Sequence, residues 1–271
     1  MAFAQSWQMF KTSATVLRTR KELAVFPVLS GAASLVVEAS FLVPIVVSDL
    51  WDKSSATTYV LFGLMYLATA FVTIFFNAAL ISQADVAMRG EDPSVGGGVR
   101  VAAGKWPRIL VWALISATVS QLLRVLQDRV GFLGSLITAI AGTAWQVVSF
   151  LVLPKMVLAD RGVVDAVKDS AEAMKRTWGE NLVGNVGLGL FGVLLAVPGG
   201  LLVIGSIALF GVSVPGALLV MAAGFVWILV AAVVVTALTG IYQTALYRYS
   251  VDGVVPVAFA DADLAHAFAR R

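Results

Sequence analysis

The chain contains no cysteine and only one histidine, His266, among its 271 residues. The absence of cysteine excludes disulfides, thiolate nucleophiles and cysteine-based metal sites. A single histidine in the C-terminal tail leaves no HExxH zinc motif and no Ser–His relay within the apolar segments. The sequence also lacks a P-loop and a dinucleotide-binding fingerprint. We therefore expect a protein that is not an enzyme and that holds neither a metal nor a cofactor.

Charged residues are scarce as well, at 13% of the chain, whereas 59% of the residues are hydrophobic and the mean hydropathy is +0.91. Soluble domains carry roughly one quarter charged residues. Apolar runs of about 20 residues recur, which is the length needed to cross a hydrocarbon core of about 30 Å. We therefore expect an all-α membrane protein in which residues 1–271 form one membrane domain. The small basic excess is more typical of orientation and lipid contact than of nucleic-acid binding.

The apolar runs predict six spanning helices arranged as three hairpins. Their approximate ranges are residues 23–50, 57–82, 109–126, 132–153, 182–210 and 214–247. The segment 1–21 is amphipathic, so it does not look like a cleavable signal peptide, and we expect the first span to be retained. The first, fifth and sixth runs exceed the roughly 20 residues that a straight crossing needs, so we expect these helices to tilt, kink or protrude.

The basic residues divide unevenly between the two sides of this topology. All but three of the 19 Lys and Arg lie in the two terminal segments or in the loops after the second and fourth spans, the exceptions being Lys53, Arg124 and Arg129. Cytoplasmic loops carry such an excess in multi-pass proteins. The distribution predicts a protein of the cell (inner) membrane with both termini in the cytoplasm.

Three charged segments on that side have helical periodicity. In 163–178 an apolar stripe recurs at steps of three and four, with charged residues on the other face; it consists of Val163, Val167, Ala171, Met174 and Trp178. Similar stripes occur in 2–20 and 94–106. We expect three cytoplasmic amphipathic helices at the membrane surface, each preceding a hairpin. The arrangement is either a weak internal repeat or a repetition of composition alone.

Two ionisable side chains lie within the predicted spans. Glu38 and Arg124 each follow the start of their span by fifteen residues, so the helical rise places them at a similar depth. An intramembrane ion pair between them is one interpretation. The alternative is that Arg124 extends toward Asp128 and leaves Glu38 protonated or facing water.

Uncharged polar residues also lie in the spans. Ser116 and Ser120 share one helix face with Arg124, which makes Ser120 a candidate site residue. We expect the amides of Gln146 and of four further residues to form hydrogen bonds between helices, the others being Asn77, Gln121, Asn185 and Gln243.

The fifth span contains a Pro–Gly–Gly sequence at Pro198, Gly199 and Gly200. This sequence should kink or break the helix. One interpretation is a broken helix that lines a binding site, as in some transporters. The other, which we favour because no charged residue is near, is close helix packing with a kink.

One charged stretch carries a resemblance to a known family. The sequence VLPKMVLADRGVVDAVKDSAEAMKRTWGENLVGN resembles that of an uncharacterised family of prokaryotic six-span integral membrane proteins, a domain of unknown function. The shared features are a proline at the span end, an acidic residue, a glycine, an Ala-to-Ser core and a closing Trp–Gly–Glu, here Pro154, Asp160, Gly162, residues 166–170 and residues 178–180. The resemblance extends over nearly the whole chain and implies a six-span fold, but it implies no activity.

Two functions fit these observations. The first is a scaffold or accessory subunit that docks a protein partner or anionic lipid through its cytoplasmic amphipathic helices. The alternative is a transporter or lipid-handling protein with a cavity near Glu38 and the 198–200 break. A solid bundle would favour the first function, and a cavity that reaches Glu38 would favour the second. The oligomeric state is not predicted.

The predicted orientation can be tested with cysteines introduced singly at Ser55 and Ser94, because the chain has no native thiol. An impermeant maleimide added to intact cells should label position 55, and it should label position 94 only after permeabilisation. Labelling of 94 but not of 55 in intact cells would reverse the orientation.

Overall fold

The structure is a computed structural model that describes residues 2–47, 56–129 and 132–252. Over these ranges the chain is helical and contains no strand. The elements are α1 (Ala2–Thr19), the short 3-10 helix η1 (Lys21–Ala24), α2 (Val25–Val47), α3 (Ala56–Met88), α4 (Val95–Gly104), α5 (Trp106–Arg129), α6 (Phe132–Leu158), α7 (Val163–Leu209) and α8 (Val214–Asp252). The predicted all-α fold is confirmed.

Six segments of the described chain are long and apolar enough to cross a membrane. They are Lys21–Val47, Ala56–Met88, Trp106–Gln127, Ile140–Leu158, Phe191–Leu209 and Val214–Arg248. Consecutive segments pack against each other as the pairs α2–α3, α5–α6 and α7–α8. Many of their large apolar side chains are exposed, among them Val36 and Leu219, as expected for helices that face lipid. The six predicted spans in three hairpins are therefore present.

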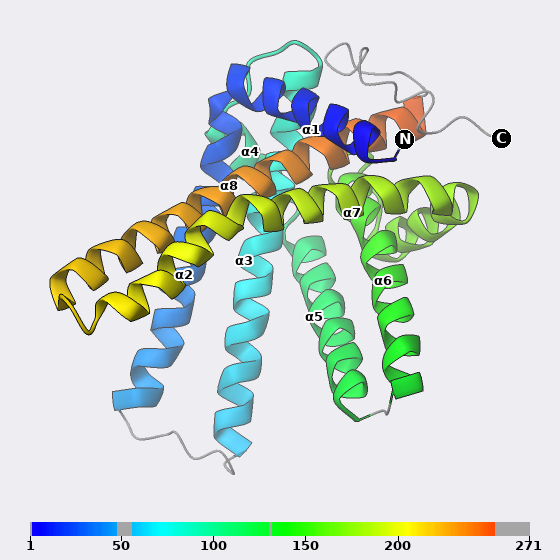
Figure 1. The fold of residues 1–271 in the computed structure, drawn as a ribbon. Helices are drawn as coiled ribbons and strands as arrows, with labels where there is room; N and C mark the ends of the chain where they lie inside the picture. The colour runs from blue at the N-terminus through cyan, green and yellow to red at the C-terminus, as the bar shows by residue number, and fades with distance from the viewer. Residues whose placement is uncertain (1, 48–55, 130–131, 253–271) are drawn as a thin grey trace.

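The hairpins meet at one end of the molecule. Figure 1 shows α2, α3, α5 and α6 extending side by side from this end, with α7 and α8 crossing them obliquely and α1 lying across the ends of the others. Helix α3 is central, since it packs against α2, α4, α5, α6 and α8. The short α4 lies against α3, and α1 lies against α7 and α8.

A core of buried apolar side chains, which we call the junction core, forms at this end. It draws on the last turns of α3, α6 and α8, the first turns of α2, α5 and α7, and one residue each from α1 and α4. Its members include Val16, Phe26, Leu80, Ile81, Ala102, Ile109, Trp112, Val152, Met156, Val163, Ala166, Ile241 and Leu246. All three hairpins thus contribute side chains to a single buried cluster.

Three sets of ion pairs surround the junction core and join segments that are far apart in the sequence. Arg20, after α1, pairs with Asp92 in the α3–α4 loop. Asp85 on α3 is 10% exposed, and its carboxylate contacts Nε of Arg248 on α8 at 2.5 Å and Arg89 at 3.0 Å. The third set joins the loop after α6 to the start of α5 through Asp160.

Asp160, two residues after the end of α6, lies in the left-handed region of backbone conformation, with φ of 55°. Its carboxylate pairs with Lys105, between α4 and α5, and with Arg108 Nη1 at 2.6 Å. Arg108 also donates to the Asp160 carbonyl at 3.0 Å. These hydrogen bonds, with Lys105 the strongest influence, hold the pKa of the Asp160 carboxyl below its ordinary value. The basic residues that indicate topology in the sequence therefore also tie the loops together.

The predicted surface helix 163–178 and the predicted span 182–210 form one continuous helix, α7. At its start Val163 and Ala166 are buried in the junction core, and the Ser170 hydroxyl donates to the Val148 carbonyl of α6 at 2.5 Å. Val167 packs against the same core, and Ala171 is half-buried. The first turns of this apolar face are therefore covered by the protein itself. The side chains of Met174 and Trp178 lie outside the described part of the chain.

Unlike 163–178, the other two predicted amphipathic segments form separate helices. The predicted segment 94–106 ends earlier than expected, because α4 stops at Gly104 and the exposed Trp106 begins α5. Ser94 caps α4 by accepting a hydrogen bond from the Gly97 amide at 3.1 Å. The predicted segment 2–20 corresponds to α1.

Helix α7 continues through Pro198, so the fifth span is not broken. Proline removes one backbone hydrogen bond and crowds the preceding turn. In that turn the Leu195 carbonyl accepts a hydrogen bond from Trp227 Nε1 of α8 at 2.8 Å. At Gly199 an added β-carbon would lie 2.8 Å from the Gly224 carbonyl oxygen, whereas at Gly200 it would meet nothing within 4 Å. The Pro–Gly–Gly sequence thus allows close packing of α7 on α8.

This packing predicts different effects for two adjacent substitutions. Gly199→Ala should lower the melting temperature in detergent, because overpacking costs about 1–3 kcal/mol and exceeds the gain in helix propensity of about 1 kcal/mol. Gly200→Ala is the matched control and should leave the melting temperature unchanged or raise it. Equal effects of the two substitutions would contradict the close contact.

The ion pairs of Asp160 predict a pH dependence. A lowered folded-state pKa means that the ionised carboxylate stabilises the fold above its ordinary pKa of 3.8, and that this contribution is lost as the pH falls through the lower, folded-state pKa. Asp160→Asn removes the charge and retains a residue that tolerates the left-handed conformation. The wild type should melt higher than this variant at pH 7, and the difference should shrink as the pH falls below about 4. A difference that stays constant over this range would show that the carboxylate charge does not matter.

Candidate functional site

The structure does not bring Glu38 and Arg124 together. Glu38 is half-buried on α2, Arg124 is exposed on α5, and each of these helices packs against α3. No ion pair joins the two residues within the described chain. The side chain of Asp128, the alternative partner of Arg124, lies outside the described part. The two charges therefore do not define a common site.

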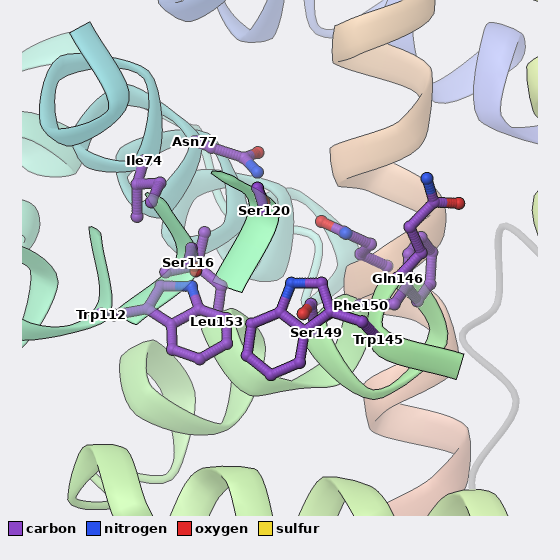
Figure 2. A pocket seen from close by; sticks show the side chains of 11 residues that line it. Ile74, Asn77, Trp112, Ser116, Ser120, Trp145, Gln146, Ser149, Phe150 and Leu153 are labelled. Atoms are coloured by element: carbon purple, nitrogen blue, oxygen red, sulfur yellow. The ribbon is translucent and has the colours of Figure 1, made fainter. Parts of the chain in front are cut away.

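A cavity of about 450 Å³ lies between four helices beside the junction core. Trp112 and Leu153 belong both to this core and to the cavity wall. Its lining comes from α3 (Ile74, Asn77), α5 (Trp112, Ser116, Ser120), α6 (Trp145, Gln146, Ser149, Phe150, Leu153) and α8 (Gln243). Figure 2 shows the two tryptophans side by side, with side chains from the other helices arranged around the same space. Two predicted candidates, Ser120 and Gln146, line this cavity. Glu38, Pro198, Gly199 and Gly200 do not.

Helical spacing explains why these side chains converge. On α5, Trp112, Ser116 and Ser120 follow each other at steps of four, which places them on one face. On α6, Trp145 and Ser149 have the same spacing. On α3, Asn77 directly precedes the fully buried segment 78–81 that anchors this helix in the junction core. The core therefore fixes the helix faces that form the cavity wall.

Three polar side chains of the cavity have buried oxygen atoms without a hydrogen-bond partner. These atoms are Asn77 Oδ1, Ser149 Oγ and Gln243 Oε1. The expected hydrogen bonds between helices are thus absent for the oxygens of Asn77 and Gln243, so this prediction was wrong for these atoms. Leaving a buried acceptor unpaired costs about 1–3 kcal/mol. All three side chains line the cavity, so each can turn a hydrogen-bonding group toward a molecule held there.

The rest of the cavity wall combines the polar side chains of Ser116, Ser120 and Gln146 with aromatic and aliphatic side chains. The ring centroids of Trp112 and Trp145 lie 5.7 Å apart with an interplanar angle of 34°. Phe150 packs against Tyr242 of α8, with the two ring centroids 5.8 Å apart. None of the lining residues is charged, and the described residues include no group of His, Asp or Glu side chains that could hold a metal ion. The arrangement can bind and orient an uncharged molecule, and it offers no charged acid, base or metal ligand.

Sequence reasoning named most of the polar residues of this site, but it missed Ser149 and the aromatic wall. The spacing of Trp112 with Ser116 and Ser120 was the signal that could have added the tryptophan. Trp145, Ser149 and Phe150 carry no comparable signal, because a bulky or small residue in an apolar run is usually lipid-facing or packed. Only the mutual arrangement of α3, α5, α6 and α8 shows that they face one space.

Comparison with known proteins places the chain in a family. No curated protein and no solved structure matches this sequence. Residues 56–257 match a family of unknown function, DUF6159. The match covers five of the six spanning segments and the loop that contains Asp160. The chain therefore belongs to DUF6159, a family of unknown function, and has six helices long and apolar enough to span a membrane.

Proposed function

We propose that the protein binds a lipid or another amphiphile in the cavity between α3, α5, α6 and α8, and that it carries or presents this molecule in the membrane. The observation that supports this most directly is the set of unpaired oxygens on Asn77, Ser149 and Gln243, three residues that line an uncharged cavity with a mixed polar and apolar wall. Polar groups within spans are costly, and such groups are candidates for function. The cavity volume of about 450 Å³ falls in the range of small-molecule sites, about 300–1,000 Å³.

The alternative of a scaffold has less support. It depended on the apolar faces of the amphipathic helices being available to a partner or to lipid. At the start of α7 that face is buried by Val163 and Ala166 in the junction core. A helix whose apolar face is already covered offers a polar surface only, and no feature of that surface identifies a partner. We therefore favour ligand binding over docking.

We propose an orientation for the cavity in the membrane, and we propose that no reaction is catalysed there. The junction core lies beside the basic loops, and on the strength of the Lys and Arg distribution we propose that it faces the cytoplasmic side of the cell membrane, with both termini on that side. The cavity then opens in the inner half of the bilayer. The lining includes no charged side chain that could act as an acid, a base or an activated nucleophile, so we propose binding or transport without catalysis.

Lipid analysis of purified variants tests this function. The protein, extracted gently and washed, should retain a distinct lipid or other amphiphile near one molecule per chain. Ser120→Leu fills the cavity and should weaken this binding at least about tenfold, or about 1.4 kcal/mol. Thr118→Leu, an exposed position on the same helix, is the matched control and should retain the ligand. Equal retention by both variants, or only bulk lipid in the wild type, would contradict the proposal.

A further inference from the structure

We infer that the molecule held in the cavity has an uncharged headgroup with several hydroxyl groups, such as a glycerol or sugar moiety. The inference rests on the proposed function and specifies its ligand. It depends on three features of the cavity wall: the absence of charge, the kind of polar atoms that lack partners, and the aromatic surface beside them.

The first feature concerns charge. The lining contains neither a carboxylate that could pair with an ammonium group nor an arginine or lysine that could pair with a phosphate. A charge that enters such a site loses its hydration and gains no counter-charge, which is strongly unfavourable. Fatty acids, phospholipid phosphates and protonated amines are therefore poor ligands for this cavity.

The second feature concerns hydrogen-bond polarity. The unpaired atoms of Asn77 and Gln243 are amide oxygens, which only accept hydrogen bonds, and the Ser149 hydroxyl can accept or donate. Gln243 is only 8% exposed. Rotation about the last side-chain bond, which is a soft torsion, turns either amide oxygen toward the cavity. With such rotations the three side chains, on α3, α6 and α8, offer both acceptors and donors, so a matching ligand needs hydrogen-bonding groups at several positions that can donate and accept. Neutral hydroxyl groups meet this requirement.

The third feature concerns shape. Trp112 and Trp145 lie side by side and form an aromatic wall (Figure 2). The C–H groups of a polyol or sugar ring pack well against aromatic ring faces, which carry partial negative charge. Ile74, Phe150 and Leu153 provide apolar contacts for the first part of an attached chain. The wall therefore matches a molecule with hydroxyl groups on one side and C–H groups on the other.

Native mass spectrometry of the protein released from lipid nanodiscs tests the headgroup. The probes are 1-monooleoylglycerol, oleoyl lysophosphatidylcholine and oleate, which share one acyl chain, and free glycerol. We expect 1-monooleoylglycerol to bind at least about tenfold more tightly than the two charged probes. Binding by free glycerol at similar concentration would assign the site to a soluble polyol instead of a lipid headgroup, with the same headgroup chemistry.

Variants connect the preference to the site. Gln243→Leu should remove the preference for the glycerol headgroup, and Ser149→Ala, which deletes one oxygen, should reduce it. Gln121→Leu is the matched amide control, because Gln121 lies on α5 outside the lining. Equal binding of the three acyl probes by the wild type would overturn the headgroup inference and leave the proposed function standing. Absence of binding by every probe, together with no ligand in the lipid analysis, would overturn both.

Discussion

The burial of helix ends in the junction core is the constraint on which the rest of the structure depends. Between helices in a bilayer the hydrophobic effect provides little attraction, because lipid tails are as apolar as leucine side chains. At the helix ends, near water, apolar burial regains its force. The chain uses this by gathering the ends of all three hairpins around Phe26, Leu80 and Ile241. The ion pairs of Asp85, Asp92 and Asp160 then link the loops and helix ends at the same level.

A cavity follows from this construction. Helices that are fixed at one end can diverge along the rest of their length, and α3, α5, α6 and α8 line an open cavity beside the junction core. Water cannot fill a site in a bilayer as freely as one at a protein surface, so unpaired oxygens there are costly. Under the proposed function, a bound molecule would supply hydrogen-bond partners for the polar side chains of Asn77, Ser149 and Gln243. The junction core fixes the helices whose faces line this space.

Much of this fold could be predicted from the sequence, and the reasons for the failures are physical. The lengths of the apolar runs predicted the six candidate spanning helices. The uneven distribution of Lys and Arg grouped the loops whose basic residues form ion pairs around the junction core. Of the two interpretations of Pro198–Gly200, the broken helix was wrong, whereas the favoured close packing agrees with the contacts of Gly199 with Gly224 and of Leu195 with Trp227 on α8. The continuity of α7 was missed because charged residues at the end of a surface helix do not stop a helix.

The site was predictable only in part. Ser120 and Gln146 were candidates because polar residues are rare in spans, and both line the cavity. The proposed pairing of Glu38 with Arg124 used depth alone, and depth does not reveal which helices are neighbours. In the structure α2 and α5 each pack against α3, and no ion pair joins Glu38 to Arg124 within the described residues. The ion pairs of Lys105 and Arg108 with Asp160 were not predicted either, because 55 and 52 positions separate these residues in the sequence.

In the structure the loop before the third hairpin contacts the start of the second hairpin through Asp160 and Lys105. Zero-length cross-linking measures this contact in the unmodified protein. A carbodiimide joins an amine to a carboxylate only when the two are in direct contact, and Lys105 Nζ pairs with the Asp160 carboxylate. Peptide mass spectrometry of treated membranes should recover an amide bond between Lys105 and Asp160, and this bond should be lost in Asp160→Asn. Cross-links from Lys105 to Asp165 or Asp169 but none to Asp160 would contradict the junction described here.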